Sequence, residues 1–212
     1  MGPGSVGLLS LECLVALEAT EIILVESLVN RRAFMLSPTR VGLKYVGRRA
    51  GESRSALFGV LALSLQLARM GIKTAWATNG DALTFNRAWC KHTFAKANSM
   101  PCYPSSGIAT SVAAMKALWL KDERPAKAVL ASCNVGIACC GDTTLALYMV
   151  RRTLLSIADV LICRGAKSGA NLLIAQSLSS AVQSVRKINL REVVFAPVEP
   201  LSQGPLVVVT TH

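Results

Sequence analysis

Aromatic residues and histidines are scarce in this sequence. Phe, Trp and Tyr make up 5% of its 212 residues, and His92 and His212 are its two histidines. So few aromatic rings limit base stacking as a way of binding nucleic acid. With two histidines and no Cys-x-x-Cys pair, the sequence argues against a zinc site, and we predict neither a metal nor a bound cofactor.

Long uncharged apolar runs are also missing. The apolar stretch 6–29 is interrupted by Glu12, Glu18, Glu21 and Glu26, and no basic segment precedes it. It therefore resembles neither a membrane span nor a signal peptide. The seven cysteines are odd in number and their spacing fits no disulfide framework. We expect a protein without a membrane span, in a reducing, cytoplasmic compartment.

Positive charge and aliphatic residues are abundant instead. Lys and Arg number 23 against 12 Asp and Glu, which gives a formal net charge of +11. Such a balance favours polyanionic partners, namely nucleic acid, an anionic membrane or phosphate-rich ligands. Apolar residues make up 52% of the chain, as suits parallel strands packed against helices.

Strand and helix patterns alternate along the chain. After an apolar segment with helical spacing at 8–30, Ser37-Pro38 interrupts the pattern. We predict an N-terminal helical element at 1–38 and a Rossmann-like domain at 39–212, an α/β fold with a parallel sheet flanked by helices. Strands are expected at 41–46, 72–77, 100–104, 128–132, 160–163, 192–196 and 205–209, and helices at 55–70, 82–97, 108–120, 143–156 and 171–185.

Three turns rich in Gly, Ser or basic residues stand between a predicted strand and a predicted helix, at 47–53, 78–81 and 164–170. In a parallel sheet such turns share the carboxyl edge of the strands, where ligands bind. Helix N-termini and glycine backbone attract phosphate there. The predicted phosphate-binding residues are Gly47, Arg48, Arg49, Ser53, Asn79, Gly80, Arg164, Lys167, Ser168 and Gly169.

Stricter signatures are absent. No turn matches Gly-x-Gly-x-x-Gly or a phosphate-binding P-loop. We find no paired carboxylates and no nucleophile with a base, so the sequence favours a protein that is not an enzyme. Asp81 and Asp142 are interpreted as helix caps.

The order of these motifs resembles the DNA-processing protein A (DprA/Smf) family of Rossmann-type proteins. The likeness rests on Tyr45-Val-Gly-Arg-Arg49, on 76–81, on 127–133, on 159–175 with its Lys-Ser-Gly turn, and on Arg191-Glu-Val-Val-Phe-Ala-Pro197. Arg151 and Arg152 stand where that family has an Arg-Asn-Arg helix start. The resemblance implies that both arginines contact phosphate.

The resemblance also implies single-stranded DNA binding, loading of a recombinase and self-association. Two alternatives stay open. One is a nucleotide sensor or phosphoribohydrolase-like enzyme of the same fold, although the glutamate of that hydrolase motif is missing from 164–170. The other is a structural subunit of a larger assembly, suggested by the apolar segments 8–30 and 55–70.

Overall fold

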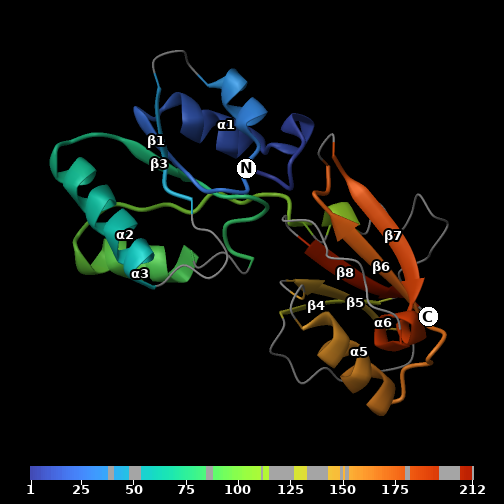
Figure 1. Cartoon of the computed structure of the whole chain (residues 1–212). Helices are drawn as coiled ribbons and strands as arrows, with labels where there is room; N and C mark the ends of the chain where they lie inside the picture. Colours follow the sequence, from blue (N-terminus) through green and yellow to red (C-terminus); the bar gives the residue numbers. More distant parts are fainter. Residues whose placement is uncertain are drawn as a thin grey trace. The chain divides into compact units, whose positions relative to one another are not determined.

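The structure is a computed structural model that describes residues 1–37, 41–47, 54–84, 88–110, 112–114, 127–132, 143–148, 150, 153–179, 182–195 and 206–211. The chain forms two compact units, Met1–Ala109 and Thr110–His212 (Figure 1). No helix among the described residues has the length and apolar character needed to cross a membrane.

Unit 1 is built on a parallel sheet of three strands in the order β2-β1-β3. Its elements are the 3₁₀ helix Val6–Leu8, α1 Leu11–Glu18, β1 Ile22–Val25, the 3₁₀ helix Arg31–Leu36, β2 Gly42–Tyr45, α2 Arg54–Arg69, β3 Thr74–Ala77 and α3 Ala88–Ala97. α2 and α3 contact each other (Figure 1). The predicted α/β class, with a parallel sheet flanked by helices, is therefore confirmed.

The middle strand β1 carries the core of unit 1. Ile23, Leu24 and Val25 are at most 1% exposed, because strands lie on both sides and side chains cover both faces. Leu17 of α1 and Phe34 join the same buried cluster. The segment 8–30, expected to be helical throughout, is thus a helix followed by the central strand.

Unit 2 contains a mixed sheet of five strands in the order β4-β5-β8-β6-β7. β4 and β5 are parallel, and the remaining pairs are antiparallel. The elements are β4 Lys127–Ser132, β5 Thr143–Tyr148, α5 Leu154–Cys163, β6 Asn171–Gln176, β7 Ser184–Asn189, α6 Leu190–Phe195 and β8 Leu206–Thr211. α5 and α6 pack together, with Leu161 and Val193 in one core cluster.

Several predicted elements in unit 2 are wrong. In place of the expected helix 143–156 the structure has β5, followed by the start of α5. In place of the expected helix 171–185 it has β6 paired with the start of β7. The expected strand 160–163 is the end of α5, and 192–195 of the expected strand 192–196 belong to α6, while residue 196 lies outside the described residues. One face of α5 is buried and carries Leu154, Ile157, Ala158 and Leu161. The apolar run Val-Leu-Ile-Cys at the end of this helix looks like a short strand in the sequence, which explains the wrong prediction.

The predictions for unit 1 agree better with the structure. The strands at 41–46 and 72–77 and the helix at 55–70 are confirmed as β2, β3 and α2, whereas no strand forms at 100–104. The helix at 82–97 is shorter, since α3 begins at Ala88 and 82–84 are bends. In unit 2, the strands at 128–132 and 205–209 are confirmed as β4 and β8.

The domain division predicted at residues 38 and 39 stays a prediction. In the structure, β1 from the first segment pairs with β2 and β3 from the second. For the helix at 108–120, residues 110 and 112–114 are helical, and most of the other positions lie outside the described residues.

Candidate functional site at the carboxyl edge of the parallel sheet

The three parallel strands of unit 1 end side by side. Val25, Tyr45 and Ala77 are the last residues of β1, β2 and β3, and the register aligns all three. The segments that follow them, 26–27, 46–47 and 78–81, therefore gather at one carboxyl edge. This edge of an open parallel sheet is where α/β proteins bind ligands.

Four glycines, Gly2, Gly47, Gly80 and Gly107, let backbone segments meet closely at this edge, and we call them the glycine edge. Gly2 N–H donates to Gly80 O at 3.2 Å, and Gly80 N–H donates to Gly2 O at 2.7 Å. Both residues have positive φ, +68° and +69°, which L side chains rarely adopt.

The other two glycines are required by close approach. A Cβ on Gly107 would lie 2.6 Å from Gly80 O, and a Cβ on Gly47 would lie 2.8 Å from Ser27 Cα. Real Cβ atoms essentially never come so near another heavy atom. A side chain at either position would push these segments apart.

Segment 101–109, which we call the strap, begins shortly after α3, ends at the last residue of unit 1 and has no regular secondary structure. Ser105 Oγ and Ser106 N–H both donate to Glu12 Oε2, at 3.1 and 3.0 Å. Ser10 Oγ donates to Ser106 O at 3.0 Å. The first turn of α1 therefore holds the middle of the strap.

Asp81 holds the strap from the other side. Its Oδ1 accepts from Gly107 N–H at 3.1 Å, while its Oδ2 accepts from Leu83 N–H at 3.1 Å and from Thr84 Oγ1 at 2.7 Å. Partial burial alone would raise the pKa of Asp81, but these hydrogen bonds to the carboxylate outweigh it and lower the pKa. Asp81 organises a turn and the strap rather than a helix start, since 82–84 are bends.

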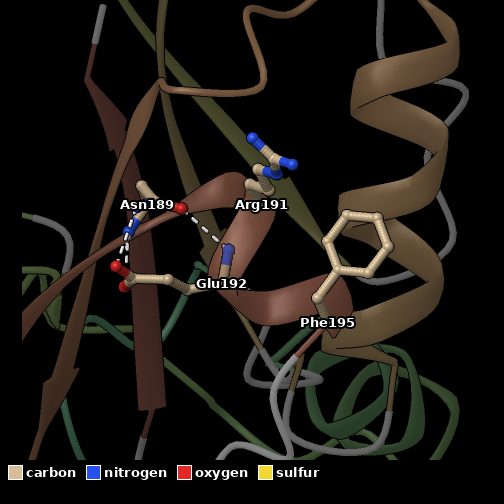
Figure 2. Close-up of a pocket in the computed structure, with 4 residues that line it drawn as sticks. All are labelled: Asn189, Arg191, Glu192 and Phe195. Atoms are coloured by element: carbon tan, nitrogen blue, oxygen red, sulfur yellow. Dashed lines mark hydrogen bonds between the residues drawn. The ribbon is translucent and has the colours of Figure 1, made fainter.

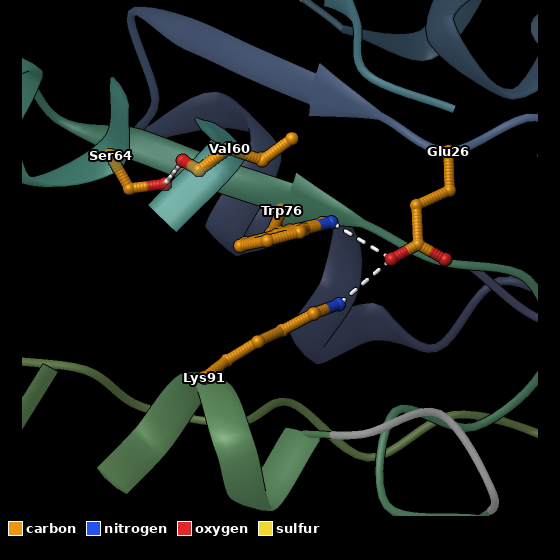
Figure 3. A network of polar contacts seen from close by, with 5 residues as sticks. All are labelled: Glu26, Val60, Ser64, Trp76 and Lys91. Carbon is orange, nitrogen blue, oxygen red and sulfur yellow. Dashed lines mark hydrogen bonds and ion pairs between the residues drawn. The ribbon is translucent and has the colours of Figure 1, made fainter. Parts of the chain in front are cut away.

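A second polar cluster lies beside the glycine edge and joins the end of β1 to β3 and α3 through Glu26, the residue after β1 (Figure 3). Glu26 Oε1 accepts from Trp76 Nε1 at 2.9 Å and from Lys91 Nζ at 2.8 Å. Lys91 Nζ also lies 3.9 Å from the centroid of the Trp76 ring. The side chains of Lys91 and Glu26 are 13% and 26% exposed, so water screens this ion pair only in part.

Cys102 belongs to the surroundings of this cluster. Desolvation raises the pKa of its thiol, and the positive charge of Lys91 opposes that rise. The thiol is thus protonated at neutral pH, and Cys102 is not an activated nucleophile.

In unit 2, Asn189, Arg191, Glu192 and Phe195 line a shallow pocket (Figure 2). Asn189 N–H donates to Glu192 Oε2 at 3.2 Å, and Glu192 N–H donates to Asn189 Oδ1 at 2.7 Å. This reciprocal pair is a capping box at the start of α6. Since these polar groups satisfy each other, the pocket has a structural explanation.

The structure brings three of the predicted site residues together. Gly47 and Gly80 belong to the glycine edge, and Asn79 precedes Gly80. Their role in ligand binding stays a prediction. Arg48, Arg49, Ser53, Arg151 and Arg152 lie outside the described residues, and so does Asp142.

The turn at 164–170 has another structure than expected. It follows a helix and precedes a strand, in unit 2 rather than at the edge of unit 1's sheet. Gly165 N–H donates to Ile162 O and Ala166 N–H to Leu161 O, with Gly165 at φ +92°. This is a Schellman cap, so Gly165 ends a helix. The strand-to-helix geometry that suggested a ligand site is therefore absent from this turn. Ligand binding stays a prediction for its residues Arg164, Lys167, Ser168 and Gly169.

Sequence reasoning missed Glu12, Glu26, Trp76 and Lys91. The glutamates were noticed only as charges that interrupt an apolar segment. A signal existed for Glu26, because it directly follows a run of four apolar residues, as a residue at a strand end does. Its partners lie 50 and 65 residues away, which no local pattern reveals.

No family model matches this sequence. Among curated proteins, the siroheme synthase of Actinobacillus pleuropneumoniae serotype 7 (strain AP76) is 26% identical over 113 residues, or 53% of this chain. The chain spans about a quarter of that relative, since the match covers 23% of its length.

Solved methyltransferase structures share the fold over nearly the whole chain. The uroporphyrin-III C-methyltransferase of Thermus thermophilus, complexed with S-adenosylhomocysteine, matches with a TM-score of 0.78, at 20% identity, over 100% of this chain and 94% of that one. Cobalt precorrin-4 methyltransferase CbiF has a TM-score of 0.77 at 13% identity, over 98% and 91%. Methyltransferase CobJ has a TM-score of 0.75 at 18% identity, over 99% and 91%.

These likenesses correct the resemblance to the DNA-processing protein A family, which is wrong. Short Gly, Ser and basic motifs recur at turns of any α/β protein, and the best of them, at 164–170, is a helix cap followed by a strand. The predicted single-stranded DNA-binding function is overturned with it. The recombinase partner and the self-association, which that resemblance implied, are overturned by the same comparisons, and so are the two alternative functions.

The methyltransferases that share this fold contradict the expectation that the protein is not an enzyme. The expectation failed for a chemical reason. Methyl transfer from a sulfonium donor needs a bound, oriented pair of reactants and no protein nucleophile. The missing catalytic set therefore had no bearing on this class of enzyme. The chain has the fold of the uroporphyrin-III and precorrin methyltransferases.

Proposed function

We propose that this chain is a methyltransferase that transfers a methyl group from S-adenosylmethionine to a tetrapyrrole. The observation that carries the proposal is the shared fold over the full chain with enzymes of this reaction class, one of them bound to S-adenosylhomocysteine. The match to a siroheme synthase supports the same substrate class.

The residues of the glycine edge fit an S-adenosyl ligand. Gly2 and Gly80 have positive φ, and the backbone of Gly107 lies so close to Gly80 O that a Cβ would not fit. Backbone of this kind approaches a ligand closely. Bound S-adenosylmethionine supplies an electrophilic methyl on its sulfonium, and the acceptor carbon takes that methyl as S-adenosylhomocysteine and a proton leave.

The charge of the chain fits a tetrapyrrole substrate. Uroporphyrin-type tetrapyrroles carry carboxylates around the macrocycle, and the chain has a formal net charge of +11. A cationic protein raises the local concentration of a polyanionic substrate. We also propose a reducing, cytoplasmic location, supported by the free thiols of Cys13, Cys90, Cys102 and Cys163.

Isothermal titration with S-adenosylmethionine and S-adenosylhomocysteine tests the cofactor. We expect both to bind in the range of about 1 μM to 1 mM that is usual for enzyme substrates, with ATP and methionine as non-binding controls. Methyl transfer is then followed by the mass of uroporphyrinogen III after incubation with the methyl donor. If no heat of binding is measured at S-adenosyl ligand concentrations up to about 1 mM, the proposal is wrong.

A glycine pair tests the location of the site. In Gly107→Ala the new Cβ must displace Gly80 O, so we expect weaker binding of S-adenosylhomocysteine. In Gly59→Ala, in the exposed middle of α2, the new Cβ meets nothing within 4 Å, so binding should be unchanged. Both are titrated at a temperature where circular dichroism shows the folded protein. Equal affinities for the two variants would place the ligand elsewhere.

A further inference from the structure

The strap at 101–109 is held by side chains rather than by its own secondary structure. Pro101, Cys102, Tyr103 and Pro104 at its start are exposed. Two of its amides, those of Ser106 and Gly107, donate to carboxylates from two different parts of unit 1. An irregular segment with few buried contacts depends on such bonds for its position.

The two carboxylates reach the strap from separate elements. Glu12 lies in the first turn of α1, and Asp81 follows the Gly80 turn after β3. Ser10, the N-cap of α1, adds a fourth bond to the strap: its Oγ donates to Ser106 O and accepts from Cys13 N–H. The strap is thus fixed at consecutive residues from both sides.

This attachment matters because the strap forms part of the glycine edge. Gly107 lies so close to Gly80 O that a Cβ would not fit between them. Gly80 in turn is paired with Gly2. Any shift of the strap at Gly107 therefore opens or closes the backbone surface to which we assign the S-adenosyl ligand.

We propose that Asp81 and Glu12 are positioning residues that clamp the strap against the glycine edge and thereby set the affinity for the S-adenosyl ligand. The ligand part of this proposal rests on the proposed function, whereas the clamp itself does not. Neither carboxylate is assigned a contact with the reacting atoms; both act through Ser105, Ser106 and Gly107.

The two carboxylates differ in how many of their oxygens accept hydrogen bonds, and amide substitutions can test this difference. Glu12 uses Oε2 alone for both of its bonds, so a glutamine can still present one oxygen to the strap. Asp81 uses both oxygens, Oδ1 for Gly107 and Oδ2 for Leu83 and Thr84. An asparagine has one acceptor oxygen and an NH₂ group that cannot accept, so it cannot keep both the Gly107 bond and the bonds to Leu83 and Thr84. Because two donors compete for the oxygen on the Leu83 side, we expect the single bond to Gly107 N–H to be lost.

Hydrogen exchange on the ligand-free protein tests the clamp. We expect Asp81→Asn to speed exchange of the Gly107 amide by about tenfold, and Glu12→Ala to speed exchange of the Ser106 amide. Glu12→Gln should restore the slow exchange of Ser106. Glu18→Ala, on the exposed end of the same helix, is the matched control and should leave the strap amides unchanged. Unchanged exchange at both amides in Asp81→Asn and Glu12→Ala overturns the clamp.

Titration with S-adenosylhomocysteine tests the link to the ligand. We expect an affinity about tenfold weaker in Asp81→Asn and a smaller loss in Glu12→Ala, with Glu12→Gln and Glu18→Ala close to the wild type. In the methyl-transfer assay the loss should raise KM for the methyl donor and leave kcat unchanged. Faster exchange with unchanged affinity overturns the link. If the wild-type protein binds no S-adenosyl ligand, the proposed function and the link fall together, while the exchange result still decides the clamp.

Discussion

Lys91 Nζ lies 3.9 Å from the centroid of the Trp76 ring, and the same ammonium group donates to Glu26 Oε1 at 2.8 Å. Trp76 donates to that same oxygen. The residue after β1 and two elements distant from it in sequence, β3 and α3, thus meet at one carboxylate oxygen (Figure 3). A charge-assisted hydrogen bond and a cation–π contact reinforce each other here, because the ion pair is partly withdrawn from water.

Lys91→Met should destabilise the protein by about 1–3 kcal/mol, because it leaves the Glu26 carboxylate half-buried beside one remaining donor. Lys96→Met, on the exposed face of the same helix, should change the free energy of unfolding by less than about 0.5 kcal/mol. Urea unfolding followed by circular dichroism measures both. A double-mutant cycle with Glu26→Gln that shows no coupling would mean that the pair contributes nothing.

Asp81 should make the stability of the protein fall in acid. The folded state lowers the pKa of Asp81 below its ordinary value of 3.8, so the contribution of its hydrogen bonds is complete above that value and is lost as pH falls through the folded-state pKa. Thermal melts between pH 7 and roughly pH 2 should therefore show a smaller acid-induced drop in Asp81→Asn than in the wild type. Identical pH profiles would contradict the lowered pKa.

Gly165→Ala should cost about 1–2 kcal/mol, because φ at this residue is +92° and an L side chain is strained there. Gly169→Ala lies in the same exposed turn without positive φ and with nothing within 4 Å of the new Cβ, so it should be neutral or slightly stabilising. Urea denaturation of the two variants compares them directly. Equal stabilities would refute the helix cap at Gly165.

Asn189→Ala should cost about 1 kcal/mol by removing the cap of α6. Asn189→Ser retains a side-chain oxygen for Glu192 N–H and should recover most of that loss. Differential scanning calorimetry gives both changes. If the serine variant is no more stable than the alanine variant, the capping box does not stabilise α6.

Much of unit 1 could be predicted from the sequence, because its signals are local. The helix 55–70 ends at Gly71, which has φ +76°, and the Ile72 N–H bond to Leu67 O completes the cap. The carboxyl edge with Gly47 and Gly80 was also predictable, since a glycine follows each of two predicted strands. The partners of those glycines, Ser27 and Gly107, were not, because the sequence does not show which segments approach each other.

The sequence by itself determined an α/β fold, the strands at 41–46 and 72–77, the helix at 55–70 and the excess of positive charge. Only the tertiary structure decided that 143–148 and 171–176 are strands, since a short apolar run can form either a helix or a strand. The choice depends on hydrogen-bonding partners, and β6 finds them in β7 and β8 on its two sides. For the same reason, only the folded chain joins Glu26 to Lys91 and Asp81 to Gly107: these contacts are selected by packing between distant segments, which no local pattern encodes.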